Sequence, residues 1–177
     1  MTTGNEAMKS FILGATSSEL PIPAYRFGTA TGPSVLVLGG VHGDEPEGIE
    51  ACLGLIQRWM AGFPFRLRVT VVPALNIDGV LRSRRVNARG VDLNRNMATN
   101  DWSPEIASSP YHPGPDPNSE PETRALVRWL DDHRPVFVVS LHSWKPRATD
   151  ARTVGRGSRA WQPGRFSAFE GRPAVRI

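Results

Sequence analysis

The chain has 177 residues, of which 40% are hydrophobic and 21% charged, and this composition fits one globular domain with a substantial core. Its one cysteine excludes an internal disulfide, and no apolar run approaches the roughly 20 residues that a transmembrane helix needs. The formal net charge of +4 originates in residues 145–177, and because no nucleic-acid-binding motif accompanies this basic segment, we expect no specific nucleic-acid partner.

The N-terminal part of the chain contains the first predicted strands. Residues 10–27 fit two short strands separated by a polar turn. The apolar run "FILGA", which comes shortly after Lys9, is too short for the apolar region of a signal peptide. We therefore expect a cytoplasmic protein without a membrane partner.

Residues 34–74 have the pattern of a βαβ unit. The continuous apolar run "SVLVLGG" (34–40) is typical of a buried parallel strand. A helix follows to about residue 61, with Pro46 in its first turn and one apolar face formed by Ile49, Cys52, Leu53, Ile56 and Met60. The segment "RLRVTVVPA" (66–74) predicts the second strand, which should lie parallel to the first.

The next segment, residues 75–118, is rich in Asn, Arg, Asp, Pro and Gly and predicts a long functional loop. A helix is predicted to begin at "SEPE", where Ser119 and Glu122 indicate a capping box with Pro121 in the first turn. A third buried strand, "PVFVVSLHS" (135–143), follows this helix. Together these elements predict an α/β fold with a mostly parallel or mixed sheet flanked by helices.

Three potential metal ligands lie where predicted strands end. His42 and Glu45 follow one strand, and His142 ends another. Ligand sites in open α/β sheets gather at the carboxyl ends of the strands. Two imidazoles and one carboxylate would leave a fourth zinc position for water, as in catalytic sites. Taken alone, however, His42 and Glu45 fit a solvated turn with a capping acid better than a metal site.

The long loop adds motifs that favour a metal site. In chain order the sequence contains "HGDE" (42–45), "NIDG" (76–79), "GVDLNRN" (90–96) and "SLHS" (140–143). This series resembles the zinc carboxypeptidases of family M14 over about residues 10–144. The segment "SEPET" (119–123) is particularly similar to bacterial murein-peptide amidases, which cut the γ-D-glutamyl–diaminopimelate bond of cell-wall peptides. Ile77 stands where the family commonly has proline.

The resemblance implies a role for six residues. One zinc ion would be bound by three of them, His42, Glu45 and His142. Asn94 and Arg95 would bind the free carboxylate of a small peptide, because a guanidinium matches a carboxylate in a bidentate fashion. The positive charge of Arg85 would stabilise the oxyanion that develops at the scissile carbonyl.

Four other polar residues of the loop receive structural interpretations. Arg84 and Arg89 are expected to be solvated. Asp92 and Asn96 are expected to shape the loop through hydrogen bonds between their side chains and the backbone.

The implied reaction is metal-assisted amide hydrolysis, in which zinc polarises the carbonyl and a carboxylate acts as general base. In the family this base is a glutamate on a later strand. The only glutamate after His142 is Glu170, which lies in no recognisable strand, so we assign no base.

The composition changes abruptly at "HSWKPRATDAR", and residues 145–177 show no strand or helix period. We expect residues 1–144 to form an incomplete zinc peptidase domain that lacks its C-terminal strands. The basic segment after it is expected to be irregular, and our hypothesis is that it replaces the family's continuation, for example through a shifted reading frame.

Three functions remain open from the sequence. The first is a zinc carboxypeptidase or amidase that acts on a small peptide, such as one from murein. The second is a non-catalytic remnant that binds zinc without a general base. The third is a zinc acylase similar to aspartoacylase or succinylglutamate desuccinylase, which share the His-x-x-Glu and Asp-Leu-Asn-Arg elements. The "NIDG" and "SEPET" segments favour the first function.

Overall fold

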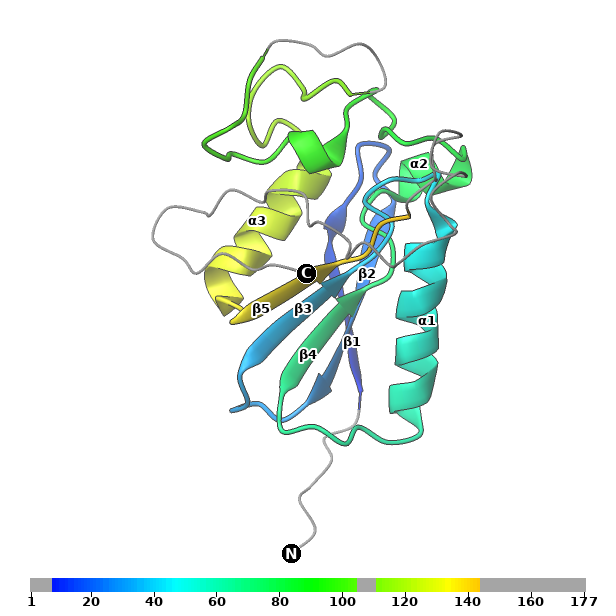
Figure 1. Cartoon of the computed structure of the whole chain (residues 1–177), viewed down its shortest axis with the longest axis vertical. Helices are drawn as coiled ribbons and strands as arrows, with labels where there is room; N and C mark the ends of the chain where they lie inside the picture. The colour runs from blue at the N-terminus through cyan, green and yellow to red at the C-terminus, as the bar shows by residue number, and fades with distance from the viewer. Residues whose placement is uncertain (1–7, 105–110, 144–177) are drawn as a thin grey trace, which may run out of the picture.

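The computed structural model of the chain describes residues 8–104 and 111–143 (Figure 1). The predicted basic segment and Glu170 lie outside these residues. Nine elements follow one another in the described part: β1 (Lys9–Ala15), β2 (Pro21–Gly28), β3 (Ser34–Leu38), α1 (Pro46–Met60), β4 (Arg68–Val72), α2 (Ile77–Leu81), the 3-10 helix η1 (Leu93–Arg95), α3 (Pro121–His133) and β5 (Phe137–Ser140).

The five strands form one mixed sheet in the order β1-β2-β4-β3-β5. β3 is parallel to both β4 and β5, whereas β2 is antiparallel to β1 and β4. The predicted α/β class and the parallel βαβ unit are therefore confirmed. The register aligns Leu38 of β3 with Val72 of β4 and with Ser140 of β5, so the carboxyl ends of the three parallel strands are level.

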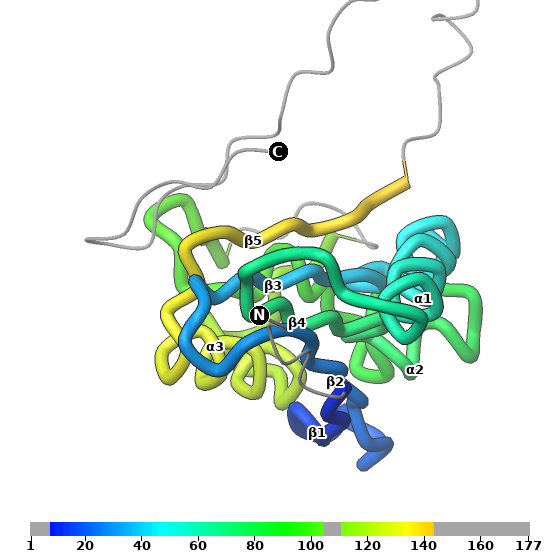
Figure 2. The backbone as a smooth tube through the Cα atoms, turned by 90° about the horizontal axis from the view of Figure 1, so that it is seen from below, coloured from blue at the N-terminus to red at the C-terminus, as the bar shows by residue number. Residues whose placement is uncertain are grey.

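Helices cover both faces of the sheet, as Figure 2 shows for α1 and α3. Successive side chains of a strand point to opposite faces, so β3 contributes to two cores. The core on the α3 side includes Leu36, Leu38, Ile22, Leu126 and Trp129. The core on the α1 side includes Val37, Val69, Val71, Cys52 and Ile56. Burial of each large apolar side chain contributes about 1.5–3 kcal/mol, which fixes the strand ends that carry the polar residues discussed below.

The predicted capping box at the start of α3 is wrong. The N-cap residue is Glu120, and its side chain makes no cap hydrogen bond, although Pro121 does begin the helix. The Glu122 carboxylate instead accepts hydrogen bonds from the backbone N–H and the hydroxyl of Ser17, at 2.9 and 3.2 Å. A buried glutamate thus ties α3 to the turn between β1 and β2, and this tertiary contact replaces the local one.

The segment predicted as one long loop contains two short helices, α2 and η1. Asn76 caps α2, because its side chain accepts a hydrogen bond from the backbone N–H of Gly79 at 2.9 Å. Asp92 caps η1 in the same way, with the backbone N–H of Asn94 as donor. Among the described residues, no helix has both the length and the apolar character needed to cross a bilayer.

Candidate metal centre

The turn that carries His42 and Glu45 lies directly against α2. It leaves β3 through Gly40, whose φ of +54° is a left-handed conformation that suits glycine. A Cβ atom at Gly43 would overlap the backbone of Gly79 and Val80. Only glycine at position 43 lets the turn approach α2 this closely, whereas Gly79 makes room for the Asn76 side chain and the Arg84 carbonyl.

Glu45 occupies the N-cap position of α1 without capping it. Its side chain makes no hydrogen bond to the first turn, which begins with Pro46. One carboxylate oxygen, Oε1, lies 2.9 Å from Nδ1 of His42. The other, Oε2, accepts a hydrogen bond from the backbone N–H of Ser143 at 3.0 Å. The Glu45 carboxylate therefore bonds to His42 and to the residues that follow β5 rather than capping α1.

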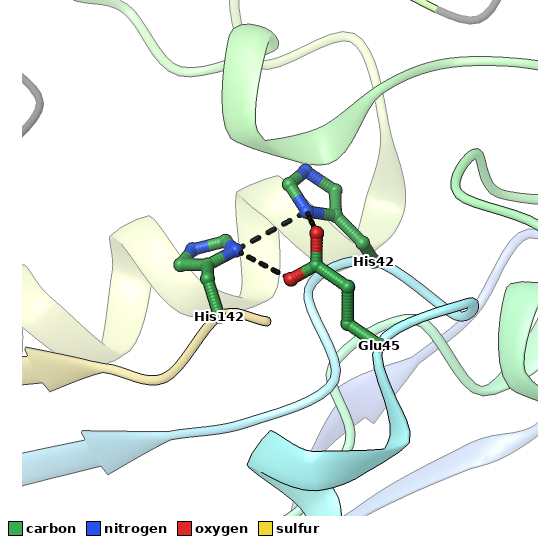
Figure 3. A group of neighbouring side chains, drawn as sticks. All are labelled: His42, Glu45 and His142. Atoms are coloured by element: carbon green, nitrogen blue, oxygen red, sulfur yellow. Dashed lines mark hydrogen bonds and ion pairs between the residues drawn. The ribbon is translucent and has the colours of Figure 1, made fainter. Parts of the chain in front are cut away.

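His142 completes the group from the neighbouring parallel strand. Figure 3 shows the three side chains converging from two strand ends. Nδ1 of His142 lies 3.0 Å from Oε2 of Glu45 and 3.1 Å from Nδ1 of His42. One potential ligand atom from each residue lies within 4.8 Å of the others. The structure thus brings together the three residues that the sequence predicted as metal ligands.

These distances fit a shared metal ion. Two ligands bound at about 2.0–2.1 Å to a tetrahedral zinc ion lie about 3.3 Å apart. The two Nδ1 atoms, of His42 and His142, are separated by 3.1 Å. The His142 side chain is 26% exposed, so solvent reaches this side of the group. Two nitrogens and one carboxylate with an open side match the donor set of a catalytic zinc site.

Asp92 contacts the ring nitrogen of His42 that faces away from Glu45 and His142. Its Oδ1 lies 3.1 Å from Nε2 of His42, so Asp92 orients the imidazole and leaves Nδ1 directed toward Glu45 and His142. Its other oxygen, Oδ2, accepts a hydrogen bond from Nε of Arg85 at 2.9 Å. Asp92 was expected only to shape the loop, and it does so through its bond to the backbone N–H of Asn94.

The electrostatics keep Glu45 negatively charged. Burial alone would raise the pKa of its carboxyl group, but hydrogen bonds with His142 and His42 outweigh this effect and hold the pKa below its usual value. Burial would lower the pKa of His42, whereas its hydrogen bonds with Asp92 and Glu45 raise it, and the net pKa is raised. For Asp92, burial acts upward and the interactions with His42 and Arg85 lower the pKa overall.

The structure places Arg85 beside the ligand Glu45 and Arg95 beside Asp92. Nη1 of Arg85 lies 3.5 Å from Oε1 of Glu45. Nε of Arg95 lies 3.7 Å from Oδ2 of Asp92, and its side chain is 50% exposed. Both guanidinium groups lie over the ring of Tyr111, with their Cζ atoms 5.0 and 5.1 Å from its centroid. Asn94 is exposed and contributes its backbone N–H to Asp92.

Sequence reasoning missed two of these contacts. The bond between Asp92 and His42 and the position of Tyr111 depend on how the loop folds back, and no local pattern indicates either. Asn96 shapes the loop as expected, since its side chain donates to the carbonyl of Pro113 and accepts from the backbone N–H of Glu120.

Arg84 and Arg89 are exposed, in agreement with the prediction that they are solvated. Arg89 makes one long contact, with its Nη1 atom 3.9 Å from the Glu120 carboxylate. Arg84 is exposed as well. Neither of them takes part in the group of metal ligands.

Comparison with known proteins identifies the family. Residues 2–148 match the family model Peptidase M14, described as zinc carboxypeptidase. The chain belongs to the zinc carboxypeptidase family. Murein peptide amidase A of Escherichia coli K12 is 35% identical to it over 150 residues, which cover 78% of this chain and 59% of the amidase.

Solved structures agree with this zinc carboxypeptidase assignment. The murein-tripeptide amidase of E. coli O157 superimposes with a TM-score of 0.60 at 30% identity, covering 76% of this chain and 60% of the amidase. Carboxypeptidase A of Helicoverpa armigera shares the fold with a TM-score of 0.70 at 23% identity, covering 78% of this chain and 41% of that enzyme. The chain therefore spans about three fifths of the length of the amidases that it matches.

Proposed function

We propose that this zinc carboxypeptidase family member hydrolyses an amide bond near the free carboxylate of a small peptide, and that a murein-derived peptide is its substrate. The observation that supports this most directly is the group of His42, Glu45 and His142 with the Arg85 guanidinium beside it. The identity of 35% to a murein peptide amidase supports the choice of substrate.

His42, Glu45 and His142 would hold the zinc ion. A bound zinc ion supplies a Lewis acid for the scissile carbonyl and lowers the pKa of a coordinated water to about 7. Asp92 keeps the His42 ring in place through the bond of 3.1 Å to its Nε2. This bond fixes which ring nitrogen faces the ion and makes that nitrogen a better donor.

Arg85 is placed to stabilise negative charge on the carbonyl oxygen. Its side chain is 21% exposed, and Asp92 and Glu45 hold it on the side of the ligands. A fixed cation in a partly dehydrated site stabilises a developing oxyanion more than water does. Arg85 therefore acts during the reaction itself.

Arg95 and Asn94 are placed to bind the carboxylate of the substrate. Both lie in η1, and Arg95 is half exposed, so its planar guanidinium remains accessible for bidentate binding. This assignment separates the roles of the two arginines. Arg95 anchors the substrate, whereas Arg85 acts on the reacting carbonyl.

The proposal is tested with the full chain loaded with zinc. Metal content and hydrolysis of L-alanyl-γ-D-glutamyl-diaminopimelate are measured, with an N-acyl amino acid as the alternative substrate. His42→Ala and His142→Ala should lose stoichiometric zinc. The control His133→Ala should keep it, because the His133 ring stacks on Trp129 at the end of α3.

Each of the other outcomes contradicts part of the proposal. Stoichiometric zinc without turnover of either substrate would indicate a non-catalytic zinc-binding protein. Turnover of the N-acyl amino acid alone would indicate an acylase. Zinc that is retained after both histidine substitutions would show that the ligand assignment is wrong.

A further inference from the structure

We propose that Tyr111 is a positioning residue for substrate binding at this centre: its ring restrains the guanidinium group of Arg95, so that Arg95 is held in position to bind the carboxylate of the substrate while Arg85 remains directed at the carbonyl. This inference rests on the proposed function. No sequence motif includes Tyr111, and the inference depends on its contacts alone.

The first observation is that both cations share one aromatic ring. The Cζ atoms of Arg85 and Arg95 lie 5.0 and 5.1 Å from the ring centroid of Tyr111. A guanidinium within about 6 Å of a ring centroid is attracted by the negative face of the ring. Two like charges would otherwise repel each other, so a shared ring stabilises their proximity.

The second observation is that the ion pair between the Arg95 guanidinium and Asp92 is long. Both oxygens of Asp92 already have close partners, since Oδ1 contacts His42 and Oδ2 accepts from Arg85 at 2.9 Å. Arg95 reaches the same Oδ2 at 3.7 Å, which is longer than a hydrogen bond. Together with this long ion pair, the ring of Tyr111 therefore restrains the direction in which the Arg95 side chain points.

The backbone keeps Tyr111 in this place. Its neighbour His112 accepts a hydrogen bond at its carbonyl oxygen from the backbone N–H of Asp92, at 2.8 Å. This bond joins the segment that carries Tyr111 to the start of η1, which carries Arg95. The ring is 38% exposed, so it can be replaced without leaving a cavity in the core.

The consequence is an asymmetry between the two arginines. When the ring is removed, Arg85 keeps its bonds to Asp92 and Glu45. Arg95 loses the contact with the ring and keeps the longer contact of 3.7 Å with Asp92. Tyr111→Leu should therefore weaken carboxylate binding about 3- to 10-fold, since a cation–π contact of this kind is worth that factor. Because Arg85 acts on the carbonyl, kcat should change less than twofold while KM rises.

The test uses the zinc-loaded full chain and the dipeptide Gly-Gly as a carboxylate probe, followed through the Nε–H NMR signals of Arg85 and Arg95. Tyr111→Phe is the matched control, because it keeps the ring and removes only the hydroxyl group. It should bind Gly-Gly within twofold of the wild type, while Tyr111→Leu binds 3- to 10-fold more weakly. Thermal melting of both variants confirms that they are folded.

The outcomes separate this inference from the proposed function. Equal binding by Tyr111→Leu and the wild type would overturn the role of Tyr111 and leave the proposed function unaffected. Equal weakening by Phe and Leu would also overturn it, because the hydroxyl group would then be responsible. A wild type that does not bind the carboxylate at all would overturn both proposals.

Discussion

Nε2 of His42 and Oδ1 of Asp92 lie 3.1 Å apart although 50 positions separate them in the chain. This contact joins a metal ligand to the loop that carries the arginines. Because Asp92 also accepts the Nε–H of Arg85, one buried carboxylate orients both the ligand and the cation.

The first prediction concerns this carboxylate. Asp92→Asn removes the negative charge beside His42 and should weaken zinc binding about 10- to 100-fold, as is usual when the partner of a metal-bound histidine is lost. Competition with a chelator measures the affinity. Asp132→Asn, an exposed position in α3, is the control and should leave zinc affinity unchanged. If both variants bind zinc like the wild type, Asp92 does not support the site.

The second prediction compares two glycines. Gly43→Ala places a Cβ against the backbone of α2 and should destabilise the fold by about 1–3 kcal/mol, the usual cost of overpacking. Gly54 lies on the exposed side of α1, where an added Cβ would meet no atom within 4 Å, so Gly54→Ala should stabilise by about 0.5–1 kcal/mol. Urea unfolding measures both changes, and a stable Gly43→Ala variant would contradict the close contact.

The third prediction is a dependence of stability on pH through Asp78, which is 1% exposed. Burial alone would raise its pKa, but hydrogen bonds from Ser18 and Thr16 and the charge of Arg82 leave the pKa below the usual value. Because the folded pKa is the lower one, this stabilisation is present at neutral pH and disappears as the pH falls through the folded pKa.

Asp78→Asn should therefore lower the free energy of unfolding at pH 7, and the difference from the wild type should shrink below about pH 4, the ordinary range of an aspartate. Urea midpoints at pH 7 and pH 3 test this. A difference that stays constant between the two pH values would show that the charge of Asp78 contributes nothing.

The fourth prediction concerns Asn87, which lies between Arg85 and Asp92 in the loop of residues 75–118. Its Nδ2 donates to the buried carboxylate of Glu120 at 2.8 Å, and its Oδ1 accepts the backbone N–H of Val91 at 3.0 Å. Asn87→Ala leaves these partners unsatisfied, which costs about 1–3 kcal/mol for each buried group. We expect a lower urea midpoint together with a higher KM, because Arg85 and Asp92 flank this turn. An unchanged KM in a destabilised variant would limit Asn87 to a role in stability.

The sequence predicted the elements whose pattern is local. The apolar run of β3 and the apolar face of α1 each carry their own signal, so strand, helix and parallel pairing were confirmed. The predicted face was wrong at Leu53 and Met60, which are exposed, while Cys52 and Ile56 are buried. The short helices α2 and η1 carry no such signal, because side-chain caps and contacts with distant segments stabilise them. The capping box was wrong for a related reason: the buried Glu122 carboxylate accepts a hydrogen bond from Ser17 and does not cap its own helix.

The candidate ligands could be predicted because their order along the chain carries the information. His42 and Glu45 follow the buried strand β3, and His142 follows β5. The prediction that this last strand is buried was wrong, because β5 lies at the edge of the sheet and its residues are exposed or half-buried. The level ends of β3 and β5 still bring the three residues together. The supporting contacts of Asp92 and Tyr111 depend on the path of a loop that has no periodic pattern. The identity of the candidate ligands could therefore be predicted from the sequence, whereas the contacts that hold them in place could not.

The pairing of β3 with β5 also determines when the site can form. His42 and His142 are 100 positions apart, so two of the three ligands leave the ribosome long before the third. Closing this segment costs loop entropy, so we expect the pairing of β3 with β5 to be a late step in folding. An ion that binds all three residues stabilises the chain only after β5 has docked, by an amount that grows with its free concentration. The free zinc concentration would then set the fraction of newly made protein in which β5 is paired with β3.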